Sequence, residues 1–215
     1  MRVHTILIGT TFSVIAASHA SAQPLARADV TGTVGWFSAD KSGISSYNDW
    51  YSRSAYGGAT FGWYWTDHLK SELELGATSA AELYGSRPID IQGQQTYVSS
   101  EHQFSTRRLV AGQQYQFYRN AWVHPHVAAG VDLTWETHQQ EDQPVFFYDP
   151  QSRVSRVVQP ARTVGPSTDL RVRPFVELGT KLYVSPRSFF RSDLRVTLGG
   201  GAEEVLVRFG FGVDF

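Results

Sequence analysis

The chain has 215 residues, a formal net charge of −1 and no cysteine. The near-neutral charge excludes a strongly basic nucleic-acid-binding surface. The lack of cysteine excludes a disulfide framework, a thiolate metal site, a cysteine nucleophile and a lipoprotein anchor. The mean hydropathy of −0.27 would ordinarily indicate a soluble protein, but a chain whose apolar residues alternate with polar ones keeps a moderate average even when one face is fully apolar.

The N-terminal residues have the pattern of a secretory signal peptide. Arg2 supplies the positive charge, Thr5–Ala17 is an apolar run, and Ala20-Ser21-Ala22 is a small-residue cleavage site. The run is too short for a membrane-spanning helix. The sequence therefore predicts a signal peptide over residues 1–22, export through the general secretory route, and one mature domain over residues 23–215.

Eight segments of the mature chain alternate between apolar and polar residues with a period of two, which predicts β-strands. In chain order they are Asp29–Ser38, Ser54–Trp65, Leu69–Leu83, Gln103–Tyr118, Ala121–Glu136, Leu170–Val184, Phe189–Gly199 and Glu204–Phe215. The fourth segment is the least regular, because Gln113 falls on its apolar face unless a bulge shifts it. Pro125 cannot donate to a strand ladder, so we expect it near a strand end.

The connections alternate between long and short. Three are long and polar, namely Ala39–Arg53, Tyr84–Ser100 and His138–Asp169. Those between them are only a few residues long, at Thr66–His68, Arg119–Asn120 and Ser185–Ser188; the last connection, Gly200–Glu203, is also short. This rhythm predicts an up-and-down antiparallel meander with short periplasmic turns and long extracellular loops.

The last segment has an uninterrupted apolar face. Every odd position from Val205 to Phe215 is apolar, and Phe209, Phe211 and Phe215 are aromatic. Eleven residues span roughly 36 Å, or about 25 Å of bilayer at a tilt near 45°. The segment resembles the C-terminal assembly signal of bacterial outer-membrane barrel proteins.

The strand and loop pattern of the mature chain resembles the small OmpA/OmpX-type barrels of Gram-negative envelopes. The resemblance implies an all-β fold, a transmembrane up-and-down antiparallel barrel of eight strands. It also implies localisation in the bacterial outer membrane, contact with outer-membrane lipid and lipopolysaccharide, and recognition by the barrel-assembly machinery.

Alternation alone does not say which face points outward. A lipocalin-like soluble barrel would turn the apolar face inward around a ligand. The regular loop asymmetry and the terminal aromatic favour the membrane barrel. So do the aromatic residues that flank the short turns, where an interfacial girdle belongs; these are Trp63, Trp65, Tyr115, Phe117, Phe189 and Phe190.

With the apolar face toward lipid, charges of both signs collect in the lumen. The predicted lumen charge network contains Lys70, Glu72, Glu74, Asp132, Arg173, Glu177, Lys181, Asp193, Arg195 and Arg208, and Arg108, Arg191 and Asp214 share the same face. An eight-stranded barrel has room for side chains and little else. Buried charges must pair, so we expect a plugged, salt-bridged lumen in preference to a conducting pore.

Few residues suggest chemistry. His124 and His126 could form a metal pair on the lumen face, but they lack an obvious third ligand, so a hydrogen-bonded structural role is favoured. His102 with Ser105, or Ser167 with Asp169, supply the residue types of a lipid A-modifying acyl hydrolase or transferase without its motif. We expect no enzyme activity and no cofactor.

The sequence therefore favours a structural, adhesion or surface-interaction role through loops 39–53, 84–100 and 138–169. The aromatic segment Val145–Tyr148 in the longest loop is a candidate contact, although local packing is its commoner explanation. A narrow channel for small solutes and, less favoured, a lipid A-modifying enzyme remain the alternatives.

Overall fold

The computed structural model describes residues 27–40, 50–91, 93–117, 122–149, 151 and 153–215. The predicted signal peptide and the predicted turn Arg119–Asn120 lie outside these residues, as does most of the loop Ala39–Arg53. In the described part of the chain no helix is long and apolar enough to cross a membrane.

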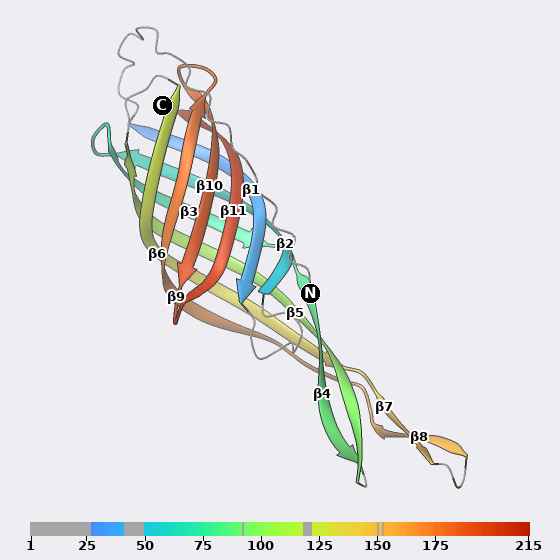
Figure 1. Cartoon of the computed structure of the whole chain (residues 1–215). Coiled ribbons are helices and arrows are strands. Elements are labelled where there is room, and N and C mark those ends of the chain that lie inside the picture. The colour runs from blue at the N-terminus through green and yellow to red at the C-terminus, as the bar shows by residue number, and fades with distance from the viewer. Residues whose placement is uncertain (1–26, 41–49, 92, 118–121, 150, 152) are drawn as a thin grey trace, which may run out of the picture.

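The described residues form β-structure almost throughout (Figure 1). The strands are β1 Ala28–Asp40, β2 Trp50–Tyr64, β3 Leu69–Thr78, β4 Ala81–Ile91, β5 Gln94–Gln116, β6 Val123–Asp142, β7 Val145–Asp149, β8 Val154–Gln159, β9 Arg162–Tyr183, β10 Ser188–Leu198 and β11 Ala202–Asp214. Eight of these described strands form a closed antiparallel ring in the order β1-β2-β3-β5-β6-β9-β10-β11. The ring closes because β1 pairs with β11, from Asp29 opposite Asp214 to Ala39 opposite Glu204.

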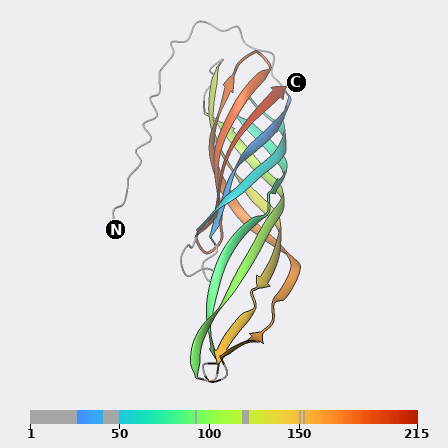
Figure 2. The same ribbon diagram turned by 90° about the vertical axis from the view of Figure 1, so that its right-hand side faces the viewer.

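The two ends of the barrel differ. At one end, here called proximal, Phe215 accepts backbone hydrogen bonds from Arg27 and Ala28. The tight turns that join β2 to β3 and β9 to β10 lie at the same end. Figures 1 and 2 show the C-terminus at this end. At the opposite, distal end β5, β6 and β9 run far beyond the ring, and Figure 2 shows them tapering away from it with β4, β7 and β8.

The distal extension consists of β4, β7, β8 and the parts of β5, β6 and β9 beyond the ring. It shows that two of the predicted loops were wrong. Segments Tyr84–Ser100 and His138–Asp169 were expected to be polar loops, but β4 pairs with β5 from Ala81–Phe104 to Ile91–Gln94, and β6 pairs with β9 out to Asp142–Arg162. A further hairpin joins β7 to β8. Solvent reaches both faces of much of this sheet, so its sequence lacks the apolar alternation that marks a half-buried strand.

Strand ends in the ring agree better with the sequence. The predicted strands that became β1, β2, β10 and β11 differ from the structure by at most four residues at each end. The predicted strand Leu69–Leu83 is instead interrupted at Ser79–Ala80, and its last residues begin β4. The predicted strands Gln103–Tyr118, Ala121–Glu136 and Leu170–Val184 are each longer at the distal end.

Side chains of the ring alternate between a polar interior and an apolar exterior. The exposed apolar belt includes Val30, Val34, Trp36, Phe61, Leu73, Leu75, Val127, Val131, Val172, Val176, Leu178, Leu194, Phe209 and Phe211. Gln113 also faces outward. No bulge interrupts β5 between its neighbours, and Gln113 donates from Nε2 to Oγ of the neighbouring Ser71 at 2.7 Å. Pro125 lies near the proximal end of β6, as expected for a residue that cannot donate.

Candidate functional site: the lumen charge network

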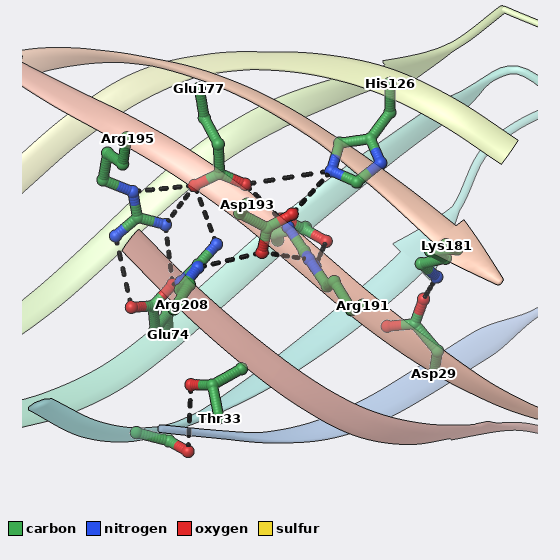
Figure 3. A network of polar contacts seen from close by, with 12 residues as sticks. Asp29, Thr33, Glu74, His126, Glu177, Lys181, Arg191, Asp193, Arg195 and Arg208 are labelled. Atoms are coloured by element: carbon green, nitrogen blue, oxygen red, sulfur yellow. Dashed lines mark hydrogen bonds and ion pairs between the residues drawn. The ribbon is translucent and has the colours of Figure 1, made fainter. Parts of the chain in front are cut away.

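The centre of the lumen is built on strands whose alternate residues point inward. Glu74 of β3, Glu177 of β9, Asp193 of β10 and Arg208 of β11 are all buried. Arg208 donates to Glu74, to Oε2 of Glu177 at 2.7 Å and to Oδ2 of Asp193 at 2.9 Å. Figure 3 shows these side chains converging from different strands. Each buried charge therefore has the close opposite charge that burial requires.

Arg195 and Arg191 connect this centre across the barrel. Arg195 donates to Oε2 of Glu74 at 2.7 Å and to Oε2 of Glu177 at 2.8 Å. Arg191 donates to Oε1 of Glu177 at 2.7 Å and to Oδ2 of Asp193 at 2.6 Å. The carboxylates are thus shared between guanidinium groups, which makes the cluster one network and not a set of separate pairs.

Two further groups lie toward the barrel ends. At the proximal end Asp29 accepts from Lys181 and from Lys70, the latter at 2.8 Å, and Tyr64 donates to Asp29 at 2.9 Å. At the distal end Arg108 donates to Asp132 and to Glu204 at 2.9 Å each, and Arg173 donates to Glu204 and, at 2.9 Å, to Glu203.

Two glycines make room for this network. A Cβ on Gly179 of β9 would lie 2.1 Å from Oδ1 of Asp193 and 2.7 Å from Nε2 of His126. A Cβ on Gly76 of β3 would lie 2.1 Å from the hydroxyl of Tyr56, which donates to Glu74. In both cases a missing side chain lets a polar group on a neighbouring strand approach the backbone closely.

The two histidines that suggested a metal site have different partners. His126 is buried and lies 3.1 Å from Oδ1 of Asp193 through Nε2, whereas His124 bonds through Nδ1 to Oε1 of Gln116 at 3.0 Å. His126, Glu177 and Asp193 place one ligand atom each within 4.8 Å of one another. Both carboxylates are already bound by arginines, so this set serves the ion-pair network and we assign no metal to it.

All ten residues of the predicted network form ion pairs within the lumen. The prediction did not single out Asp29, Tyr56, Tyr64 and Glu204, which also contribute. Asp29 and Glu204 lie at the starts of predicted strands and share the inward parity of Thr31 and Arg208, so the alternation could have identified them.

The predicted aromatic girdle needs one correction. Trp63, Trp65, Tyr115, Phe117 and Phe190 are exposed around the proximal turns, but Phe189 is fully buried. Adjacent strand residues point to opposite faces, so Phe189 and Phe190 cannot both face lipid. The ring of Phe189 lies 4.0 Å from the Lys181 ammonium inside the lumen.

The residues of the predicted assembly signal lie on the outer surface of β11 and just after it. Phe209 contacts Trp36 edge-on with ring centroids 6.1 Å apart, and Phe211 contacts Phe190 at 5.3 Å. Phe215 is exposed at the proximal end.

In the distal extension, the residue types of a hydrolase do not assemble. His102 and Ser105 lie on opposite faces of β5. The Nδ1 atom of His102 lies 3.1 Å from Nε2 of His138, and the Ser167 hydroxyl donates to the backbone carbonyl of His138 at 3.5 Å. Burial and the neighbouring His138 lower the pKa of His102 below its ordinary value.

No protein-family profile and no curated protein matches the sequence. Among solved structures, neisserial surface protein A is similar with a TM-score of 0.52 and 12% identity, over 87% of this chain and 97% of that one. The outer membrane protein OprG from Pseudomonas aeruginosa has a TM-score of 0.49 and 12% identity, over 91% of this chain and 99% of that one. The N-terminal β-barrel domain of Pseudomonas aeruginosa OprF has a TM-score of 0.47 and 14% identity, over 88% and 98%.

The likeness to neisserial surface protein A agrees with the closed antiparallel ring described above. An exterior belt of this kind is stable in a bilayer and not in water. The chain therefore has the fold of the small eight-stranded outer-membrane β-barrels.

Proposed function

We propose that this chain is a non-conducting barrel that anchors a surface-exposed β-sheet, through which it contacts partners outside the cell. The observation that carries the proposal is the distal extension. Its strands hold large exposed side chains beyond the apolar belt, among them Tyr84, Tyr97, Phe146, Tyr148 and Val157. Exposed apolar and aromatic groups outside the membrane are typical of interaction sites.

The ion pairs support a closed lumen. In the ring order β3 and β10 stand four places apart among eight strands, which is diametrically opposite. Arg195 of β10 nevertheless reaches Glu74 of β3 with two hydrogen bonds, at 2.7 and 3.2 Å. Side chains therefore meet across the full width of an interior that is just wide enough for them.

Recordings in planar bilayers test the closed lumen. The refolded full chain should give no discrete conductance steps, because opening a water path would require breaking several buried ion pairs at once. Stable, reproducible steps in wild-type protein would support the channel alternative instead.

The distal end is proposed to face the outside, since small barrels place short turns in the periplasm and long hairpins outside. Protease added to intact cells should then cleave within residues 143–161, around β7 and β8, and spare residues 66–68. Cleavage that requires an opened outer membrane would reverse the orientation.

Adhesion assays test the surface role. Cells that lack the protein should regain attachment or cell–cell aggregation when they produce the wild-type chain. They should not regain it with a Phe146→Ser, Tyr148→Ser double variant, whose two exposed side chains can change without loss of core packing. A Val172→Ala variant in the lipid belt is the matched control. Equal behaviour of cells with the wild-type chain, the double variant and no protein would contradict the proposal.

The enzyme alternative has less support. His102 and Ser105 point to opposite faces of β5, and the Ser167 hydroxyl bonds to a backbone carbonyl. Mass spectrometry of lipid A from cells with and without the protein should show the same species.

A further inference from the structure

A groove of about 980 Å³ lies on the outer surface where the ring meets the distal extension. Its lining includes Leu75, Ala77, Ser105, Arg107, Trp135 and Thr137. The register across β3, β5, β6 and β9 arranges these side chains in successive rows around the barrel. Those rows change in chemistry from the membrane side outward.

The first row is apolar, since Leu75, Leu109, Leu133 and Val172 lie opposite one another. The next row sets Ala77, Arg107, Trp135 and Leu170 side by side. The third row carries hydroxyls, from Ser105 to Thr137 to Thr168. Strand geometry separates these rows by about 7 Å each, so the change from hydrocarbon-like to polar surface occurs over the depth of a lipid headgroup region.

Arg107 stands at the centre of this transition. It is exposed, and no described residue forms an ion pair with its guanidinium group, whereas Arg108, the next residue, forms ion pairs with Asp132 and Glu204 inside the lumen. Trp135 beside it is the residue type that prefers the membrane–water interface. The hydroxyls of Thr137 and Thr168 lie 3.0 Å apart, so one of them keeps its proton free for a further acceptor.

The acidic groups on the same outer face are farther out. Glu82 lies opposite Gln103, four residues along β5 from Arg107, and Glu101 and Glu141 lie opposite each other, six residues from the Arg107–Trp135 row. These separations are about 13 and 20 Å, and both exceed the Debye length of about 8 Å at physiological salt. The field at the groove is therefore set by Arg107 and favours an anion.

We propose that this groove binds the phosphorylated sugar of lipid A, with a phosphate on Arg107 and acyl chains along the leucine row below. A guanidinium group matches a phosphate with paired hydrogen bonds, and the hydroxyl row can donate to the same phosphate or to sugar oxygens. The choice of lipid A rests on the proposed orientation, which puts the distal rim in the outer leaflet.

Binding by the full chain, refolded in detergent micelles, tests the site. Native mass spectrometry or a titration should compare bisphosphorylated lipid A, chemically dephosphorylated lipid A, phosphatidylglycerol and inorganic phosphate. We expect the bisphosphorylated lipid to bind at least tenfold more tightly than the dephosphorylated one, as loss of a charge-assisted contact predicts. Equal affinity for these two lipids, or a preference for phosphatidylglycerol, would overturn the proposal, as would equally tight binding of inorganic phosphate.

Variants locate the contact. Arg107→Gln should weaken lipid A binding about tenfold, Arg107→Lys should weaken it less, and Arg156→Gln on exposed β8 should leave it unchanged. Unaltered affinity in Arg107→Gln would refute the assignment. If that variant does not fold, the lipid comparison on wild-type protein still decides. The micelle measurements do not depend on orientation, so failure of the site and failure of the proposed topology give separate results.

Discussion

Arg191 of β10 and Glu72 of β3 form a two-fold hydrogen-bonded ion pair, with Nη1–Oε1 and Nη2–Oε2 distances of 2.5 and 3.0 Å. The two strands lie on opposite sides of the ring, so the pair ties together walls that no backbone hydrogen bond connects. The same guanidinium group also holds Glu177 and Asp193. The Arg191 side chain therefore links strands β3, β9 and β10.

Replacement of Arg191 by Met should destabilise the folded barrel strongly. The change leaves Glu72, Glu177 and Asp193 with less positive charge in a buried site, and loss of one partner of a buried ion pair costs about 3–5 kcal/mol. Urea unfolding of the refolded protein in detergent measures the free energy of unfolding. Arg156→Met, on the exposed β8, is the control and should change it by less than about 0.5 kcal/mol. A similar small effect for both variants would show that the lumen pairs contribute little.

Gly179 gives a second test of the network, because a substitution there removes space for the side chains and changes no charge. In Gly179→Ala the new methyl group must displace Asp193 or His126, so we expect a loss of about 1–3 kcal/mol in the free energy of unfolding. Gly32→Ala is the matched control, because an added Cβ there meets no atom within 4 Å. A strand glycine replaced by alanine without a clash should be neutral or slightly stabilising. Equal destabilisation by the two variants would refute the packing argument.

The membrane-spanning part of the fold could be predicted from sequence because one physical rule governs it. Lipid outside and a crowded polar lumen inside impose a strict period of two, and Val205–Phe215 shows it without interruption. The same parity located the lumen charges. It could not say which carboxylate meets which guanidinium, since Glu74 and Arg208 approach through the closure of the ring and not through sequence spacing.

The distal extension was missed because neither of its faces meets lipid. Strand β4 even contains Pro88, which is tolerated because β4 is an edge strand. Prolines did mark real interruptions, since Pro144 falls between β6 and β7 and Pro160 between β8 and β9. A polar, proline-containing stretch is thus compatible with a ladder wherever a longer strand such as β5 or β6 supplies the partners.

The extension should loosen at mildly acidic pH. The fold lowers the pKa of His102 below 6.5, so folding favours the neutral imidazole. Its contribution to stability is complete above pH 6.5 and is lost as the pH falls through the lowered pKa. Asp142 on β6 opposes the shift, while Arg87 and Arg162 lie near that carboxylate.

Hydrogen exchange, corrected for the intrinsic pH dependence of amide exchange, measures this effect. Protection of amides around residues 100–104 and 136–140 should fall below about pH 6. Amides of β10 and β11 in the ring should keep theirs. His102→Phe preserves a ring beside Phe104 and should remove the pH dependence. Loosening that persists in this variant would assign it to another group.

Removal of Phe215 separates assembly from stability. Its side chain is exposed on the lipid side, so the deletion removes one aromatic's burial, about 1.5–3 kcal/mol. That is a modest loss for a barrel in which every strand of the ring is paired on both sides. If the terminus acts as the proposed assembly signal, deletion should lower the outer-membrane yield in cells far more than the stability of barrels refolded in detergent.

Arg208→Ala should do the opposite, because it strips a buried cation from Glu74, Glu177 and Asp193 without altering the outer face of β11. Yield by immunoblot and stability by urea unfolding, measured for both variants, give a two-by-two comparison. Parallel losses of yield and stability in the Phe215 deletion would mean that the terminal aromatic is ordinary lipid-facing packing.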